Sequence, residues 1–431
     1  MEQALAWAGE HGVAVVPFGG GTSVVGGVTC DAATRAGAAL AGRGPPYGVV
    51  SLDLAATSGV HEVDPVSRTA RIGAGTLGPD LEAALAPLGL TLRHYPQSFA
   101  FSTLGGWIAT RAGGHFATRY THIDDLVAGI RMITPVGAWA SRPLPASGAG
   151  PSPDRLVLGS EGALGVITEA VVRLQGRPRF RSKVSVGFDT FAPGVAACRA
   201  IVQSGLAPAN CRLLDEREAR LHGVTADGRA VLLLGFESAH HPVAPLLDLA
   251  LQAAEDCGGR RAGEPQHTDA ERATGDREGE RWREAFFEGP YLQTALLTTG
   301  AVVDTFETCC TWSAFEALHA DVVRSVRAAL GKPALVSCRF THVYPDGPAP
   351  YYTFVAPATH GDQLARWRVA KQAAGDALMR HQATVTHHHA VGRVHRPWYD
   401  EQRPEPFARA LRAAKAALDP AGVLNPGVLG L

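Results

Sequence analysis

The segment Pro17–Gly27 is Pro-Phe-Gly-Gly-Gly-Thr-Ser-Val-Val-Gly-Gly, and it directly follows the short apolar run Val13–Val16. Three successive glycines tolerate positive φ and carry no side chains, so backbone N–H groups can close around a pyrophosphate. Thr22 and Ser23 add hydroxyl donors. The segment matches neither GxGxxG nor GxxxxGK[ST], which excludes the dinucleotide fingerprint and the Walker loop. It predicts a phosphate-binding loop, with a flexible surface turn as the alternative.

The composition is that of an ordinary soluble globular chain. It has 431 residues, a formal net charge of −1 and 46% hydrophobic residues, which disfavours a nucleic-acid or anionic-membrane surface. The longest apolar run, Ala230–Phe236, is too short to span a membrane. Met1–Gly12 lacks the features of a signal peptide, and Val428–Leu431 carries no peroxisomal signal. We therefore expect a cytoplasmic protein.

The seven cysteines contain no CxxC pair, which favours buried, reduced thiols in a reducing compartment. Arginine and alanine abound while lysine is rare, a bias typical of a GC-rich bacterial genome.

Two further segments resemble the glycine loop in their residue composition. Pro96–Trp107, which continues to Gly114, and Gly159–Thr168 both combine glycines with hydroxyl or acidic residues. Such backbones can approach a ligand closely, although each segment alone would be equally compatible with turn chemistry.

Helical and strand patterns alternate along the chain, and the lengths of these elements differ between two regions. Up to about residue 176 the elements are short, with strands expected at 49–54 and 69–72. Beyond it, long amphipathic helices, such as 312–330, alternate with strands at 230–236, 334–344 and 351–356. The pattern predicts an α+β protein with a cofactor lobe and an inserted cap. A single strand precedes the glycine loop, so we expect the cofactor lobe to be short at its N-terminus.

Taken together and in this order, the three glycine-rich segments resemble the FAD domain of the vanillyl-alcohol oxidase flavoprotein superfamily. Within it, the chain resembles the alkyldihydroxyacetonephosphate (alkylglycerone-phosphate) synthases. The further matching segments are Cys211–Asp215, Ser337–Arg339, Tyr351–Phe354, His387–His389 with Val391-Gly392, Leu418–Pro420 and Leu424–Gly427. The resemblance implies a two-lobed FAD-binding domain over 1–175, an antiparallel-sheet cap over 176–375, and a C-terminal segment, 376–431, that returns to the FAD lobe and completes the active site.

The resemblance also implies which residues bind FAD. They are Pro17, Phe18, Gly19, Gly20, Gly21, Thr22, Ser23, Gln97, Ser98, Phe99, Ala100, Phe101, Ser102, Thr103, Thr110, Arg111, Ala112, Gly113, Glu161, Gly162, Ala163, Leu164, Gly165, Val166 and Ile167. Thr22 stands where some members of the superfamily carry a flavin-linking histidine. We therefore expect the FAD to be bound non-covalently.

The implied reaction uses the flavin as a scaffold and not as a redox carrier. The acyl group of acyl-dihydroxyacetone phosphate is exchanged for a fatty alcohol through a flavin adduct, a step of ether-lipid synthesis. The resemblance implies that Arg339 binds the phosphate, Tyr352 donates and accepts the proton, and Arg212 is important to activity. An arginine fork suits a phosphate dianion because its planar donors bind two oxygens. Ordinary salt bridges and a half-buried strand aromatic are the alternatives.

The triplet His387, His388 and His389 admits more than one interpretation. Adjacent histidines often bind a metal or form a solvated tract, and in an extended segment at most two of three can serve one site. Relatives that remove hydride carry Glu-His-Gly here, whereas the synthases carry three histidines followed by Val-Gly. We assign the triplet to the flavin site, where it would help activate the alcohol, and expect no metal; a metal or structural role stays open.

A hairpin argument relates Arg339 to Tyr352. If 345–350 is the hairpin loop, residue 344 faces 351, and the pairing register places Arg339 and Tyr352 on one face of the sheet.

Two other functions compete with the transferase. The shared fold would also suit an FAD-linked oxidase or dehydrogenase of a 2-hydroxy acid or alcohol, or a flavin-binding module without activity. We expect a small-molecule lipid substrate and no nucleic-acid partner. A lipid substrate favours peripheral membrane contact, and a homodimer is a further expectation.

Overall fold

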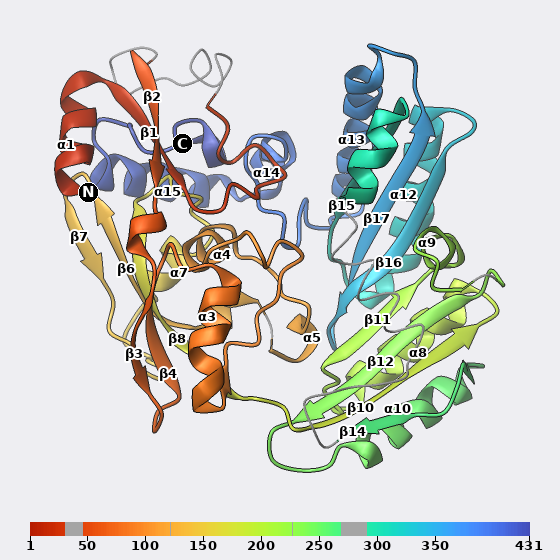
Figure 1. Ribbon diagram of the computed structural model, residues 1–431. Coiled ribbons are helices and arrows are strands. Elements are labelled where there is room, and N and C mark those ends of the chain that lie inside the picture. The colour runs from red at the N-terminus through yellow and green to blue at the C-terminus, as the bar shows by residue number, and fades with distance from the viewer. Residues whose placement is uncertain (31–45, 121, 226, 269–290) are drawn as a thin grey trace. The chain divides into compact units, whose positions relative to one another are not determined.

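The computed structural model describes residues 1–30, 46–120, 122–225, 227–268 and 291–431, and they form two compact units (Figure 1). Unit 1 comprises Met1–Gly114, Tyr120–Gly176 and His388–Leu431, and unit 2 comprises His115–Arg119 and Arg177–His387. The second division falls after His387 and not at the predicted position 376. The reason is that helix α13 (Gln363–Arg380) continues through the predicted boundary and packs in the core of unit 2.

The main sheet in the described part of unit 1 has five strands in the order β3-β4-β8-β6-β7, with antiparallel neighbours. The strands are β3 (Val60–Asp64), β4 (Thr69–Gly73), β6 (Val127–Thr134), β7 (Gly137–Ala140) and β8 (Val166–Arg173). The short strands β5 (Leu90–Thr91) and β9 (Gln175–Gly176) pair separately. Helices α3 (Gly78–Leu85) and α4 (Leu104–Thr110) bury Leu81 and Trp107 in the core formed with this sheet. The short helices α6 (Ile123–Leu126) and α7 (Pro153–Val157) also belong to unit 1, whereas α5 (Ala117–Tyr120) lies mostly in the segment His115–Arg119 of unit 2.

The strand before the glycine loop is held on two sides. Helix α1 (Glu2–His11) ends at Gly12, whose φ of 65° terminates the helix in the left-handed conformation. Strand β1 (Val13–Phe18) then pairs in parallel with β2 (Gly48–Asp53). The Val15 N–H donates to the Val423 carbonyl at 2.7 Å, and its carbonyl accepts from the Asn425 N–H at 2.8 Å.

The C-terminal segment of unit 1 carries helices α14 (Arg396–Gln402) and α15 (Glu405–Leu418) (Figure 1). The buried ammonium of Lys415 in α15 donates to the carbonyls of Ala163 and Leu424 and pairs with Asp419 at 2.7 Å. This segment therefore packs as part of unit 1, and it supplies a second neighbour for β1 beside β2.

The described strands of unit 2 form an eight-stranded antiparallel sheet in the order β13-β10-β12-β11-β16-β17-β15, with β14 beside β10. The strands are β10 (Phe180–Phe188), β11 (Asn210–Leu214), β12 (Ala230–Ser238), β13 (Arg260–Arg261), β14 (Gln266–Thr268), β15 (Ala301–Glu307), β16 (Leu335–Val343) and β17 (Pro348–Pro357). The antiparallel sheet predicted for this part of the chain is thus confirmed.

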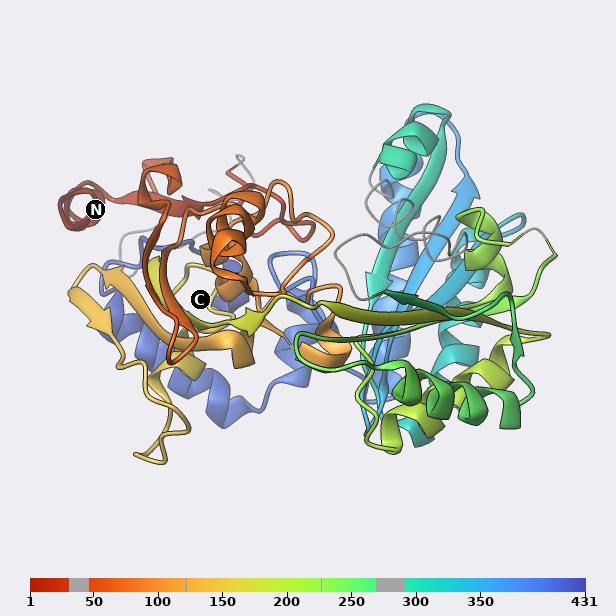
Figure 2. The ribbon, with the colours of Figure 1, turned by 60° about the horizontal axis from the view of Figure 1, so that its bottom comes forward.

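Helices cover the two faces of this sheet unequally. Helices α8 (Phe191–Gln203), α10 (Ala244–Asp256), α12 (Trp312–Leu330) and α13 supply the apolar residues that bury one face. Figure 2 shows α8 and α10 together on one side of β10 and β12. The short helix α9 (Glu216–Leu221) packs Ala219 against Leu214 and Leu233 on the other face. The second face is therefore where polar side chains of the sheet can gather.

None of the helices among the described residues has the length and apolar character needed to cross a membrane.

Candidate functional site

The glycine loop lies against the second glycine-rich segment in unit 1. A Cβ atom on Gly20 would lie 1.7 Å from the carbonyl oxygen of Phe101, and one on Gly19 would lie 2.4 Å from Thr103 Oγ1. Gly21 has a φ of 66°, which L-residues rarely adopt. The absence of side chains at these positions is therefore a steric requirement of the loop.

The third segment meets the same loop. Gly162, with a φ of 75°, approaches Pro17 so closely that a Cβ would lie 2.9 Å from Pro17 Cγ. The Glu161 N–H donates to the Ala109 carbonyl of α4 at 3.0 Å. The structure thus brings together the three segments that were far apart in the sequence.

The geometry of this junction is compatible with binding of the flavin nucleotide. The glycine loop exposes Gly21 and Thr22 at its tip, and its backbone is held open by the packing of Gly19 and Gly20. Uncovered amides and hydroxyls of this kind suit a pyrophosphate. Within the loop, Ser23 Oγ accepts from the Gly27 N–H at 3.1 Å, which closes its second half.

Several predicted cofactor residues have structural contacts of their own. Ala163, Leu164 and Val166 are completely buried, so their side chains belong to the core, and only their main chain could serve a ligand. Arg111 pairs with Asp124 at 2.7 Å, and Ser102 Oγ accepts from the Trp107 indole at 2.7 Å. Among the other predicted positions, Ala100 and Phe101 are exposed, and the following are buried or half-buried: Gln97, Ser98, Phe99, Thr110, Ala112, Gly113, Gly165 and Ile167.

In unit 2, the two predicted arginines lie on the same face of the sheet. Arg212 of β11 is completely buried, and its Nη1 lies 3.1 Å from His115 Nδ1. Its neighbour Leu214 pairs with Arg339 of β16. Burial and the charge of Arg339 lower the pKa of Arg212 to about 9. The structure therefore concentrates positive charge on the face opposite α8, α10, α12 and α13.

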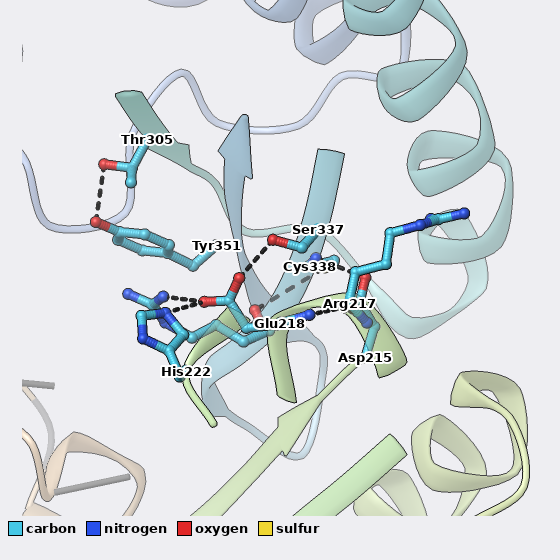
Figure 3. Close-up of polar contacts among 9 residues, drawn as sticks. Asp215, Arg217, Glu218, His222, Thr305, Ser337, Cys338 and Tyr351 are labelled. Carbon is cyan, nitrogen blue, oxygen red and sulfur yellow. Dashed lines mark hydrogen bonds and ion pairs between the residues drawn. The ribbon is translucent and has the colours of Figure 1, made fainter. Parts of the chain in front are cut away.

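Arg339 forms a buried ion pair, which is the alternative considered for it in the sequence, with a partner that the sequence did not identify. Its guanidinium binds the carboxylate of Glu218 in α9, which also contacts Ser337 and His222 (Figure 3). Burial opposes ionisation of Glu218, but Arg339 and the hydrogen bonds from His222 and Ser337 lower its pKa to about 2. Glu218 is therefore ionised at neutral pH and offsets the charge of Arg339.

The predicted shared face of Arg339 and Tyr352 was wrong. The hairpin turns over Tyr344–Gly347, and next to it Val343 pairs with Pro348 in a register of the predicted parity. A β-bulge between Phe340 and His342 then inserts one residue, so Arg339 pairs with Tyr351. Because side chains alternate along a strand, one extra residue moves Tyr352 to the other face.

The two adjacent tyrosines consequently have different surroundings. The Arg339 guanidinium carbon lies 3.8 Å from the centre of the Tyr351 ring, and the Tyr351 hydroxyl donates to Thr305 Oγ1 at 2.8 Å (Figure 3). Tyr352 is completely buried in the apolar core, stacked on Phe306 and 3.3 Å from His319 Nδ1. Burial raises the pKa of Tyr352 well above its ordinary value.

The histidine triplet is divided between the units. His387 belongs to unit 2, where its N–H donates to Glu307 and its Nε2 lies 3.0 Å from the Tyr344 hydroxyl. His388 and His389 belong to unit 1, and their ring centres lie 4.6 Å apart. The segment is not a regular strand, so the predicted alternation of its side chains does not apply.

Several polar residues of these regions were missed by sequence reasoning. Glu218 follows the helix-capping Asp215, whose Oδ1 accepts from the N–H groups of Arg217 and Glu218, a pattern that predicts a helix start but not its ion pair. His94 is 1% exposed and has no hydrogen-bond partner for either ring nitrogen among the described residues. Burial and the nearby His122 lower its pKa to about 3, so it is neutral. A lone histidine in the sequence gives no signal of such an environment.

Comparisons with known proteins agree with this arrangement. Residues 177–429 match the model of the C-terminal domain of FAD linked oxidases, and residues 1–141 match an FAD binding domain. The chain is 30% identical to alkyldihydroxyacetonephosphate synthase of Trypanosoma brucei brucei, over 97% of this chain and 70% of that protein. It is 25% identical to glycolate oxidase subunit GlcD of Bacillus subtilis, over 97% of this chain and 84% of that protein.

A solved structure of an alkyldihydroxyacetonephosphate synthase superposes with a TM-score of 0.77 at 26% identity, covering 99% of this chain and 74% of that one. FAD is accordingly the cofactor of this chain. Both the matched domain models and the relatives lead to one conclusion: the chain belongs to the FAD-linked oxidase family of flavoproteins, of the vanillyl-alcohol oxidase type, and is similar to the alkyldihydroxyacetonephosphate synthases.

Proposed function

We propose that this chain is an alkylglycerone-phosphate synthase-like transferase, which exchanges the acyl group of acyl-dihydroxyacetone phosphate for a fatty alcohol. Unit 1 is then the FAD-binding lobe, and unit 2 is the substrate-binding cap. The bound flavin would supply the ring nitrogen that displaces the acyl group. The substrate would be a lipid, which favours peripheral membrane contact. A homodimer is a separate part of the proposal.

The cationic face of unit 2 supports an anionic substrate. Arg212 and Arg339 lie on one face of the sheet, and both are buried. A guanidinium suits a phosphate dianion because its planar donors bind two oxygens. A phosphate dianion bound there would accept hydrogen bonds from a guanidinium fork and favour the charged form of Arg212.

Tyr351 is the better candidate for the proton donor on this face. Burial raises the pKa of its hydroxyl while Arg339 opposes that rise, so the phenol stays protonated at neutral pH and can donate. We expect Tyr351→Phe to lower turnover roughly a hundredfold or more, the usual contribution of a general acid. Tyr352→Phe, which removes the contact with His319, should keep most of its turnover and lose only about 1 kcal/mol of stability.

Steady-state turnover and the visible spectrum of the bound flavin would be measured for both variants. Equal activity of Tyr351→Phe and wild type would remove Tyr351 from the mechanism. A specific loss in Tyr352→Phe, with its flavin spectrum intact, would restore the role first assigned to Tyr352.

The competing function is FAD-linked oxidation of a 2-hydroxy acid or alcohol, and the similarity to glycolate oxidase subunit GlcD favours it. The purified FAD-loaded enzyme would be mixed anaerobically with acyl-dihydroxyacetone phosphate and a labelled fatty alcohol, or with glycolate or lactate. The transferase releases a fatty acid and incorporates the label without net reduction of the flavin. Full bleaching of the flavin by a hydroxy acid, reversed by air, would replace the transferase with the oxidase.

The attachment of the flavin is tested separately. Thr22 at the exposed tip of the glycine loop has no nitrogen with which to form a flavin link. We expect acid precipitation to leave all yellow colour in the supernatant, and colour that stays in the pellet would contradict non-covalent binding.

A further inference from the structure

Glu161 occupies a central place in unit 1. Its side chain is 8% exposed, and its φ of 49° is in the left-handed region that favours glycine. Its N–H donates to Ala109, and its carbonyl accepts from Asn425 Nδ2 at 2.7 Å. The main chain of Glu161 is therefore fixed from two directions, and a strained residue held in this way points to a specific use of its side chain.

The carboxylate of Glu161 binds the polypeptide itself. Oε1 accepts from the Val391 N–H at 2.9 Å, and both oxygens lie within 3.1 Å of the Gly392 N–H. A Cβ on Gly27 of the glycine loop would lie 3.3 Å from Oε2. The carboxylate therefore fills the space between the glycine loop and the chain after the histidine triplet, which differs from the cofactor contact predicted for it.

The chain at Val391 and Gly392 is attached to the glycine loop as well. The N–H groups of Arg393 and Val394 both donate to the Val25 carbonyl, at 2.8 and 3.1 Å. Gly392 has a φ of 53°, and a Cβ there would lie 2.3 Å from the same carbonyl oxygen. His388 and His389 come immediately before this attached segment and belong to the same unit.

We propose that Glu161 is a positioning residue that fixes His388 and His389 in the cofactor lobe by binding the main chain of Val391 and Gly392 against the glycine loop. This role concerns the lobe that binds FAD, and it does not depend on which reaction the enzyme catalyses. The two hydrogen bonds that the N–H groups donate to this carboxylate are charge-assisted, and such bonds are stronger than those between neutral groups. Neutralising the side chain should therefore loosen the segment without removing a core residue.

The test uses Glu161→Gln in the FAD-loaded protein at pH 8. Burial raises the pKa of Glu161 to about 7, although the hydrogen bonds from Gly392 and Val391 and the charge of Arg393 oppose this rise. The wild-type side chain is therefore mostly ionised at pH 8. Backbone hydrogen exchange over 390–394 should accelerate by about tenfold or more, which corresponds to the loss of one strong hydrogen bond. Glu161→Asp, which keeps the charge but has a shorter reach, should lie between wild type and Glu161→Gln.

The placement of the histidines is measured in the same samples. Exchange of the imidazole C2 hydrogens of His388 and His389 should change in Glu161→Gln, while that of His61 on β3 should not. Glu169→Gln is the matched control, because Glu169 is a half-buried carboxylate of the same unit that pairs with Arg71 and Arg131. It should leave the exchange over 390–394 unchanged.

Unchanged exchange over 390–394 in both Glu161 variants would overturn the proposal. So would acceleration that is uniform across unit 1, or one that Glu169→Gln reproduces, since either would make Glu161 a general contributor to stability. Turnover is not among the readouts, and the result therefore cannot be confused with a failure of the proposed reaction.

Discussion

Gly20→Ala is expected to abolish the binding of FAD at micromolar concentrations. The added methyl group would lie 1.7 Å from the carbonyl oxygen of Phe101, which is main chain and cannot rotate away. Overpacking of this kind costs about 3 kcal/mol. If the loop has to open to relieve it, the affinity for FAD falls by more than about a hundredfold. Titration of the deflavinated protein with FAD, followed by flavin fluorescence, measures the change.

Gly48→Ala is the matched control for this substitution. Gly48 begins the strand that pairs with β1, and a Cβ there would meet no atom within 4 Å. Its affinity for FAD should equal that of the wild type. Wild-type affinity in Gly20→Ala would mean that contact with Phe101 does not shape the loop.

Glu218→Ala is expected to destabilise the protein by about 3–5 kcal/mol, the cost of leaving a buried charge without its partner. The substitution removes the carboxylate that binds Arg339, while the guanidinium stays 5% exposed. It also removes the acceptor of Ser337. Urea denaturation of the FAD-loaded protein, followed by circular dichroism, gives the free energy of unfolding.

Glu405→Ala is the control for an ion pair outside the core. Glu405 pairs with Arg409 while both side chains are about two-thirds exposed, so its removal should cost no more than about 1 kcal/mol. A second variant, Glu218→Gln, keeps the volume of the side chain but not its charge. A loss below about 1 kcal/mol in both Glu218 variants would contradict the assigned strength of the buried pair.

Local patterns predicted much of the secondary structure. Helix α12 has the predicted bounds, and strands β1, β4 and β12 begin at the predicted residues. The glycine-rich segments also indicated where the backbone makes close contacts. Such contacts, like that of Gly20 with Phe101, require glycine, and glycine can be recognised directly in the sequence. The features that were predicted correctly depend on residue type and spacing alone.

Residue-level geometry in unit 2 was less predictable. The bulge near Thr341 leaves no mark in the sequence, since it depends on how β16 fits two neighbouring strands at once. It reversed the face of Tyr352 relative to Arg339. The Glu218–Arg339 pair joins residues that are remote in the chain, so only the fold reveals it. The roles assigned to the predicted site residues, including the histidine triplet, stay predictions.

The attachment of β1 to the C-terminal segment has a consequence for biosynthesis. Val15 is synthesised before residues 177–387 of unit 2, whereas its partners Val423 and Asn425 are synthesised after them. Domains generally fold as units while the chain is synthesised, so the nearly continuous unit 2 can fold before unit 1 is complete. Until residues 423–425 have been synthesised, strand β1 in front of the glycine loop can pair on one side at most. Loading of FAD is therefore expected to follow the folding of unit 2, and a ribosome stalled short of residue 423 should hold a folded unit 2 but no flavin.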